Sequence, residues 1–138
     1  MNGEPWNLES LPLSPVIVVA AVIERDGEFL LTLRPAGTHL AGYWEFPGGK
    51  CDPHENHQEA LRRELFEELD IVGRIHECLL SVTHRYADRT VELHFYRCDF
   101  EGTPKPMLGQ HLRWVSRRDL RTLPLPEADA ELIALLAG

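Results

Sequence analysis

The chain has 138 residues, of which 43% are hydrophobic and 26% are charged, as in an ordinary folded protein. We therefore expect a single domain over residues 16–138, large enough to bury a core without disulfides or metal ions, and a flexible N-terminal arm over residues 1–15. The formal net charge of −8 argues against a nucleic acid polymer as partner, since binding its backbone requires concentrated Lys and Arg. A small anionic ligand is still compatible with this charge, because a bound divalent cation can reverse the local field.

The cysteines and the apolar runs indicate the cellular setting. Cys51, Cys78 and Cys98 form no CxxC pair, so the sequence predicts neither a disulfide framework nor a zinc site, and a reduced cytoplasm fits best. The longest apolar run, residues 16–23, is eight residues long, whereas a membrane-spanning helix needs about 20. We expect a cytoplasmic protein with no membrane partner, and the pattern leaves open whether it is a monomer or a homodimer.

The first part of the chain has the pattern of three strands. Residues 16–25 (VIVVAAVIER) have the β-branched content of a buried strand. Asp26-Gly27 is a turn that leads into an antiparallel partner strand at residues 28–34. Residues 44–46 form a short strand, which the breaker sequence at residues 47–49 (Pro-Gly-Gly) is expected to end.

The rest of the chain begins with a helix from about Asn56, its N-cap, to Leu69, with Glu59 completing a capping box. Residues 76–86 and 90–100 form a second hairpin across a short turn. The remaining expected elements are a strand at residues 111–115, a helical turn capped by Ser116, and a closing helix at residues 126–136. The order β-β-β-α-β-β-β-α-α predicts an α/β (α+β) fold, in which helices pack on the faces of a mixed β-sheet.

The predicted helix carries a cluster of acids in the segment ALRRELFEELDI, residues 60–71. Glu64, Glu67 and Glu68 fall within an arc of roughly 100° on one helical face. Arg63 lies one turn before Glu67, but Glu64 and Glu68 oppose each other at i, i+4, where like charges cost a helix about 0.2–0.5 kcal/mol. We infer that a positive charge from outside the helix compensates them.

A glycine-rich segment, EFPGGK at residues 45–50, leads into this helix and exposes backbone carbonyls near its start. Several glutamates together with a backbone carbonyl are the oxygen ligands that Mg²⁺ prefers, whereas zinc would require histidine or cysteine. Mg²⁺ usually shares its coordination shell with substrate phosphates. The pattern therefore indicates a nucleotide or another polyphosphate as the ligand.

From Gly49 the chain resembles the Nudix box, G-x5-E-x7-R-E-U-x-E-E-x-G-U, where U is aliphatic. It reads Gly49, five residues, Glu55, seven residues, and then the run RELFEELDI at residues 63–71. All fixed positions match but one, where Asp70 replaces a glycine that ends the helix. Such a glycine is often left-handed, and Asp tolerates that conformation at a modest cost.

Over most of the chain the sequence is similar to the MutT-type Nudix hydrolases. That resemblance implies an α/β/α sandwich, dependence on Mg²⁺ (for which Mn²⁺ may substitute), and cleavage of a nucleoside triphosphate to the monophosphate and pyrophosphate. The leading expectation is an oxidised purine nucleotide such as 8-oxo-dGTP, removed to clean the nucleotide pool. Alternatives are dCTP or methyl-dCTP, another nucleoside diphosphate derivative, and a non-catalytic nucleotide-sensing domain, which the complete set of box carboxylates disfavours.

The resemblance also suggests roles for the box residues. The Gly48 carbonyl with Glu64, Glu67 and Glu68 is expected to bind Mg²⁺, and Glu64 is the first candidate for the base that deprotonates the attacking water. Gly49, Glu55 and Arg63 are expected to support the site, Arg63 by pairing with Glu55. An ordinary surface ion pair between Arg63 and Glu67 is the alternative.

Outside the box, the resemblance implies a set of substrate-binding residues, namely Arg34, His39, Phe46, Tyr86 and Asp129. Arg34 and His39 stand near the substrate in such enzymes, Phe46 and Tyr86 flank the base, and Asp129 reads it. Each also has a simpler explanation: solvated side chains, aromatic residues on a sheet face, and a first-turn carboxylate favoured by the helix dipole. Two positions depart from the family pattern, because Leu108 and Arg113 replace glutamates.

Overall fold

The computed structural model describes residues 14–38 and 41–138. The expected arm at residues 1–15 therefore falls almost wholly outside the described residues, as does His39. The elements in chain order are β1 (Val16–Arg25), β2 (Glu28–Leu33), β3 (Trp44–Glu45), β4 (Gly48–Lys50), α1 (His57–Leu69), β5 (Val72–Arg85), β6 (Thr90–Glu101), β7 (His111–Ser116), two short 3-10 turns (Arg118–Arg121 and Glu127–Asp129) and α2 (Ala130–Ala137).

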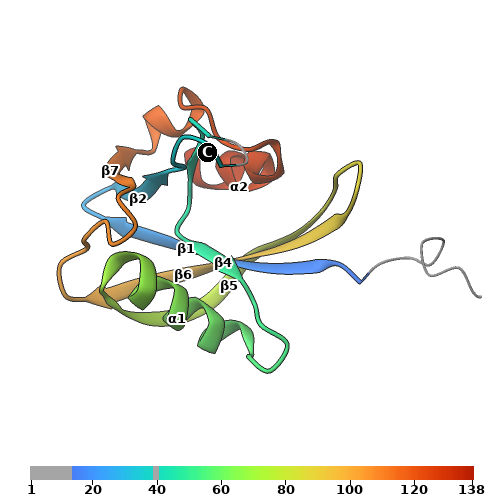
Figure 1. The fold of residues 1–138 in the computed structure, drawn as a ribbon. Coiled ribbons are helices and arrows are strands. Elements are labelled where there is room, and N and C mark those ends of the chain that lie inside the picture. The colour runs from blue at the N-terminus through green and yellow to red at the C-terminus, as the bar shows by residue number, and fades with distance from the viewer. Residues whose placement is uncertain (1–13, 39–40) are drawn as a thin grey trace, which may run out of the picture.

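The long strand β1 organises the sheet (Figure 1). It pairs with β4 in antiparallel and with β6 in parallel orientation, and its last two residues pair with β2. Strand β2 continues the sheet to β3 and β7, and β5 closes the other edge by pairing with β6. Both predicted hairpins are thus antiparallel, and the sheet as a whole is mixed, as the sequence predicts.

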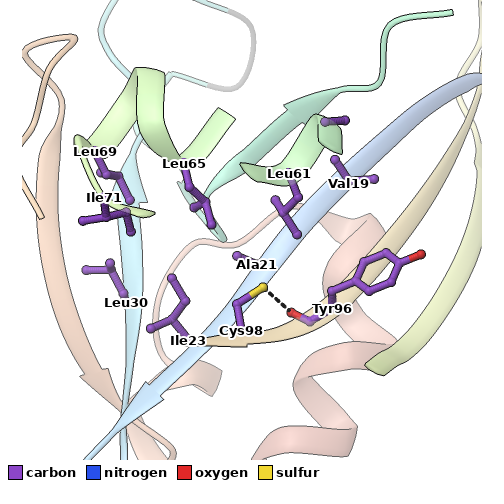
Figure 2. Packing of buried hydrophobic residues seen from close by; sticks show 11 residues of the cluster. Val19, Ala21, Ile23, Leu30, Leu61, Leu65, Leu69, Ile71, Tyr96 and Cys98 are labelled. Carbon is purple, nitrogen blue, oxygen red and sulfur yellow. Dashed lines mark hydrogen bonds between the residues drawn. The ribbon is translucent and has the colours of Figure 1, made fainter. Parts of the chain in front are cut away.

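Alternate residues of β1 supply two hydrophobic cores, one on each face of the sheet. Val19, Ala21 and Ile23 face α1, whose buried stripe is formed by Leu61, Leu65 and Leu69 (Figure 2). The intervening residues of β1 belong to the second core, which includes Phe29, Phe95 and Leu132 of α2. Each such leucine contributes about 1.5–3 kcal/mol by burial. The two cores confirm the predicted sandwich with helices on both faces.

Helix α1 begins and ends as its sequence indicates. The Asn56 side chain accepts a hydrogen bond from the Glu59 N–H (2.8 Å), and the Glu59 carboxylate accepts one from the Asn56 N–H (2.9 Å). This confirms the capping box. At the other end Asp70 is left-handed, with φ 57° and ψ 39°, and its N–H donates to the Phe66 carbonyl. Asp70 therefore adopts the conformation for which the box pattern has glycine.

The structure differs from the expected elements in four respects. The short strand β3 does end before the Pro-Gly-Gly segment, at Glu45, but residues 48–50 then form the unexpected strand β4, in which the lack of a side chain lets Gly48 approach β1: a Cβ there would stand 2.0 Å from the Val19 carbonyl oxygen. Strand β5 begins at Val72 instead of residue 76, since its polar residues Arg74 and His76 pair with Asp99 of β6 and obscure the apolar alternation.

The third difference is the closing helix, which begins with a 3-10 turn at Glu127–Asp129 before α2. This turn is fixed by a bond from the Asp129 N–H to the Pro126 carbonyl (2.9 Å). The N-cap of the preceding turn is Arg117 instead of the expected Ser116, although the Ser116 hydroxyl accepts a hydrogen bond from the Asp119 N–H (3.2 Å). Within the described parts of the chain, no helix is long and apolar enough to span a membrane, and all three cysteines are free thiols.

Candidate active site

A cavity of about 570 Å³ opens where β1, β4, α1, the tip of the β5–β6 hairpin and the turn before α2 meet. Most of the predicted site residues line it, namely Arg34, Phe46, Gly48, Gly49, Glu64, Glu68, Tyr86 and Asp129. Glu55, Glu67 and Arg63 are not among its lining residues. The fold thus brings candidate metal ligands and candidate substrate contacts from distant parts of the sequence into one space.

Glu64 and Glu68 form the acidic wall of this cavity. The Glu64 side chain is only 14% exposed, and a Cβ on Gly49 would lie 1.8 Å from its Oε2 atom, so the glycine makes room for the carboxylate. Burial raises the pKa of both carboxyl groups, and the charge of Glu64 raises the pKa of Glu68 further. The like-charge pair predicted from helical spacing is therefore also desolvated, which makes a compensating cation more favourable.

Glu67 differs from the other two acids. Its side chain is 55% exposed and accepts a hydrogen bond from Arg63 (3.2 Å). Over residues 14–38 and 41–138, no three histidine, cysteine or carboxylate side chains form a ready-made metal cage. Two carboxylates with a carbonyl are nevertheless compatible with Mg²⁺, because this ion keeps several of its waters and takes substrate oxygens as ligands.

The Gly48 carbonyl is placed to act as such a ligand. The Ala21 N–H donates to the Pro47 carbonyl (2.7 Å), which makes this a hydrogen-bonded pair of the β1–β4 ladder. Hydrogen-bonded and non-hydrogen-bonded pairs alternate in an antiparallel ladder, so the next pair, Ala20 with Gly48, is non-hydrogen-bonded. The carbonyl of Gly48 therefore points away from β1 and is available to a ligand.

Arg63 joins the loop before α1 to the acidic wall. Its guanidinium donates two bonds to Glu55 (Nε to Oε2, 2.6 Å; Nη2 to Oε1, 2.8 Å), one to Glu64 (2.9 Å) and one to the Lys50 carbonyl (3.1 Å). The Arg63 contact lowers the pKa of Glu55 to about 2, helped by the Asp52 N–H. Both pairings considered from the sequence exist together, with Glu55 and with Glu67.

Asp129 is the most unusual polar group in the cavity. It is 4% exposed, and no side chain or backbone group of the described residues hydrogen-bonds its carboxyl. Burial, followed by the charge of Glu45, raises its pKa to about 7. Buried polar groups in native proteins are almost always partnered. A carboxyl without a partner, facing a cavity, is therefore a candidate for contact with a ligand.

Glu45 was not predicted from the sequence. It lines the cavity, accepts a hydrogen bond from Arg34 (2.7 Å), and its charge raises the pKa of both Glu68 and Asp129. Burial raises the pKa of Glu45 itself, and Arg34 opposes that shift. An acid between two aromatic residues, in the short strand before the glycine turn, is the signal that could have identified it.

The other predicted contacts, Phe46 and Tyr86, line the same cavity. Phe46 is buried and packs edge-on against Phe95, with 6.1 Å between ring centroids, so it serves both the core and the cavity. The pKa of Tyr86 is raised by burial and then by Asp129. Three further polar residues line the cavity without having been predicted: Lys50, Asp88 and Arg89. Asp88 and Arg89 lie in the short turn of the second hairpin.

The two departures from the family pattern lie outside the cavity. Leu108 is 65% exposed, and the guanidinium of Arg113 stands 5.9 Å from the centre of the Trp44 ring. Neither position supplies a carboxylate. In this chain the additional acid near Glu68 is Glu45, which lines the same cavity.

Comparison with known proteins agrees with this geometry. Residues 18–135 match the model of the NUDIX domain family. The chain is 44% identical over 117 residues to CTP pyrophosphohydrolase of Escherichia coli (84% of this chain and 87% of the relative), and 32% identical over 121 residues to 8-oxo-dGTP diphosphatase of the same species (87% and 94%). The crystal structure of MutT NUDIX hydrolase from Burkholderia pseudomallei superposes with a TM-score of 0.76 at 33% identity, covering 89% of this chain and 97% of that one.

The chain therefore belongs to the Nudix domain family. Its MutT-type character is confirmed by these relatives, and so is its class, an enzyme that hydrolyses nucleoside triphosphates. Nudix hydrolases generally need a divalent metal ion. The acidic wall of Glu64 and Glu68 beside Gly48 is the part of this chain whose chemistry fits such an ion.

Proposed function

We propose that the chain hydrolyses a nucleoside triphosphate to the monophosphate and pyrophosphate, and that Mg²⁺ is its cofactor, with Mn²⁺ as a substitute. The observation that carries this proposal is the pair of Glu64 and Glu68 at the cavity wall: burial raises the pKa of both carboxyl groups, and of the two only Glu64 has an arginine partner in the described part of the chain. The Gly48 carbonyl and these two carboxylates would hold the ion, with Glu67 from the rim. Bound there, the cation would offset negative charge on the phosphoryl oxygens.

The residues of this chain divide the remaining work. Glu64 is the proposed base for the attacking water, since Gly49 and Arg63 hold its carboxylate at the cavity wall. Positioned bases typically contribute about 10²–10⁴ in rate. The two hydrogen bonds from Arg63 to Glu55 hold the loop before α1 against the helix. Arg34, through its bond to Glu45, fixes the acid whose charge raises the pKa of Asp129.

For the nucleobase of the substrate, we favour cytosine over an oxidised purine. The relative that is 44% identical is named CTP pyrophosphohydrolase, against 32% for the 8-oxo-dGTP diphosphatase. Cytosine presents an exocyclic amine, which can donate hydrogen bonds to the carboxylates of Asp129 and Glu45. The nucleotide 8-oxo-dGTP remains the second candidate, because a protonated Asp129 can also donate to a purine carbonyl.

The test is a panel of nucleoside triphosphates with Mg²⁺, including CTP, dCTP, methyl-dCTP and 8-oxo-dGTP, scored separately for pyrophosphate and orthophosphate. We expect pyrophosphate and the monophosphate as first products, fastest with a cytosine nucleotide, and no turnover with a chelator. Orthophosphate as first product, or no turnover of any triphosphate, would contradict the proposal. We further propose that residues 16–138 act as one catalytic domain in the cytoplasm, consistent with its free thiols.

A further inference from the structure

The loop between β6 and β7 closes the C-terminal end of the catalytic helix. The last carbonyls of a helix have no partner within it. In α1 the Glu68 carbonyl accepts hydrogen bonds from the Gln110 side-chain N–H (3.0 Å) and the Met107 N–H (3.1 Å). The Leu69 carbonyl accepts one from the Lys105 N–H (2.9 Å). The loop thus replaces the missing turn of the helix.

Gln110 is the side chain that makes this contact rigid. It is 7% exposed, and the only other buried polar or charged residues in the described part of the chain are Thr32 and Asp129. Both ends of its amide are used, since its oxygen accepts from the Leu108 N–H (2.9 Å) while its nitrogen donates to Glu68. The next residue, His111, begins β7 and pairs with Leu33 of β2. Gln110 therefore ties the end of α1 to the sheet.

Glu68 needs such support more than Glu64 does. Glu64 is held by Arg63 and packs against Gly49, whereas no Lys or Arg in the described part of the chain forms an ion pair with Glu68. Glu68 is also the penultimate residue of α1, where helices fray. The left-handed Asp70 that follows it costs more than the glycine of the box pattern would.

We propose that Gln110 is a positioning residue of the metal site: by holding the Glu68 carbonyl it fixes the last turn of α1 and keeps the Glu68 carboxylate beside Glu64. This inference rests on the proposed function in one respect, that Glu68 is a ligand of Mg²⁺. Gln110 itself touches neither the ion nor the substrate. It acts through the backbone of the residue that does.

The test measures Mg²⁺ binding by calorimetry in wild type and Gln110→Met, which keeps the length of the side chain and removes both hydrogen bonds. We expect the dissociation constant for Mg²⁺ to rise about tenfold, the scale seen when a residue that orients a metal ligand is removed. The Asp70 amide, bonded to Phe66, should exchange faster with solvent. Ser116→Ala is the matched control, because it removes a hydrogen bond to the Asp119 N–H in a turn away from the cavity and should leave both readouts unchanged.

A measurement on the wild-type chain covers the case in which Gln110→Met does not fold. The side-chain amide protons of Gln110, followed by NMR, should exchange more slowly than those of Gln58 on α1 and should slow further when Mg²⁺ is added. Unprotected Gln110 protons, or a folded Gln110→Met that binds Mg²⁺ like wild type, would overturn the inference. Because these readouts need no turnover, a chain that binds Mg²⁺ but hydrolyses no nucleotide would disprove the proposed function alone.

Discussion

The Cα of Gly49 lies against the carboxylate of Glu64, so closely that a Cβ on the glycine would stand 1.8 Å from Oε2. The backbone conformation at Gly49 is not left-handed, so the position requires glycine for its lack of a side chain and not for its φ angle. Gly49, the first residue of the box, thus shapes the acidic wall directly.

Gly49→Ala should therefore separate activity from folding. The added methyl group forces the Glu64 side chain away from its place, which costs little stability because a carboxylate at the cavity wall can rotate. We expect turnover to fall by about 10²-fold, the order contributed by a positioned base. Circular dichroism and steady-state rates at saturating Mg²⁺ check this. Val115→Ala is the control: Val115 belongs to β7 and lies in the second hydrophobic core, so this variant should lose stability and keep turnover. A Gly49→Ala variant as active as wild type would remove Glu64 from the mechanism.

Glu64 and Glu67 of α1 should not contribute equally to turnover. Glu64→Gln should keep the fold and lose about 10²–10⁴ in turnover, since it removes the proposed base. Glu67→Gln should lose less, because the Glu67 side chain is exposed, pairs with Arg63 and does not line the cavity. Rates measured over a Mg²⁺ titration compare the two variants. Equal losses in both would show that exposure at the rim does not reduce the contribution of Glu67.

Asp129 should make the chain less stable as pH rises toward neutrality. Its pKa is raised to about 7 in the folded state, by burial first and by Glu45 second, whereas Asp in an unfolded chain ionises near 3.9. Between these values the folded state binds more protons, so this group's contribution to the free energy of unfolding falls with rising pH. The loss is complete above about pH 7 and amounts to at most about 4 kcal/mol.

Asp129→Asn, which does not ionise, isolates this effect. Free energies of unfolding from urea titrations at about pH 5 and pH 8 should show a larger loss in wild type than in the variant. An equal loss in both chains would contradict the burial of an ionisable Asp129. The same variant should change the preference among nucleotides and leave the Mg²⁺ requirement intact, as expected of a residue that contacts the base.

Asp70→Gly should stabilise the chain modestly. Asp70 has φ 57°, a conformation that costs an ordinary residue about 1–2 kcal/mol and glycine almost nothing. The greater conformational entropy of glycine in the unfolded chain lowers the free energy of unfolding by about 0.4–1 kcal/mol and so offsets part of this gain. The pair between Lys105 and Asp70 (3.6 Å) is exposed and contributes little. Thermal unfolding should show a small rise in Tm, and a clear fall would mean that the Asp70 side chain stabilises the helix end.

The sequence was most informative where function depends on local spacing. Helical periodicity placed Glu64 and Glu68 together, and the capping box fixed where α1 begins. Contacts between distant segments were harder to predict. Glu45 and Asp129 line one cavity, and the charge of Glu45 raises the pKa of Asp129, but no local sequence pattern relates the two residues. The pair of Glu67 with Arg63 followed from the helical spacing, but the exposure of Glu67 outside the cavity did not. A helical wheel shows Glu67 one turn from Arg63, but it does not show that Arg63 bonds Glu55 and Glu64 at the same time.

The most direct test of the central claim is a crystal structure of the chain with Mn²⁺ and a non-hydrolysable nucleoside triphosphate, since Mn²⁺ is located by its anomalous scattering. We expect a cation bound by carboxylate oxygens of Glu64 and Glu68 and by the Gly48 carbonyl, at about 2.0–2.2 Å, with phosphate oxygens completing its shell. A cation located elsewhere, or one that contacts no carboxylate of α1, would contradict the claim.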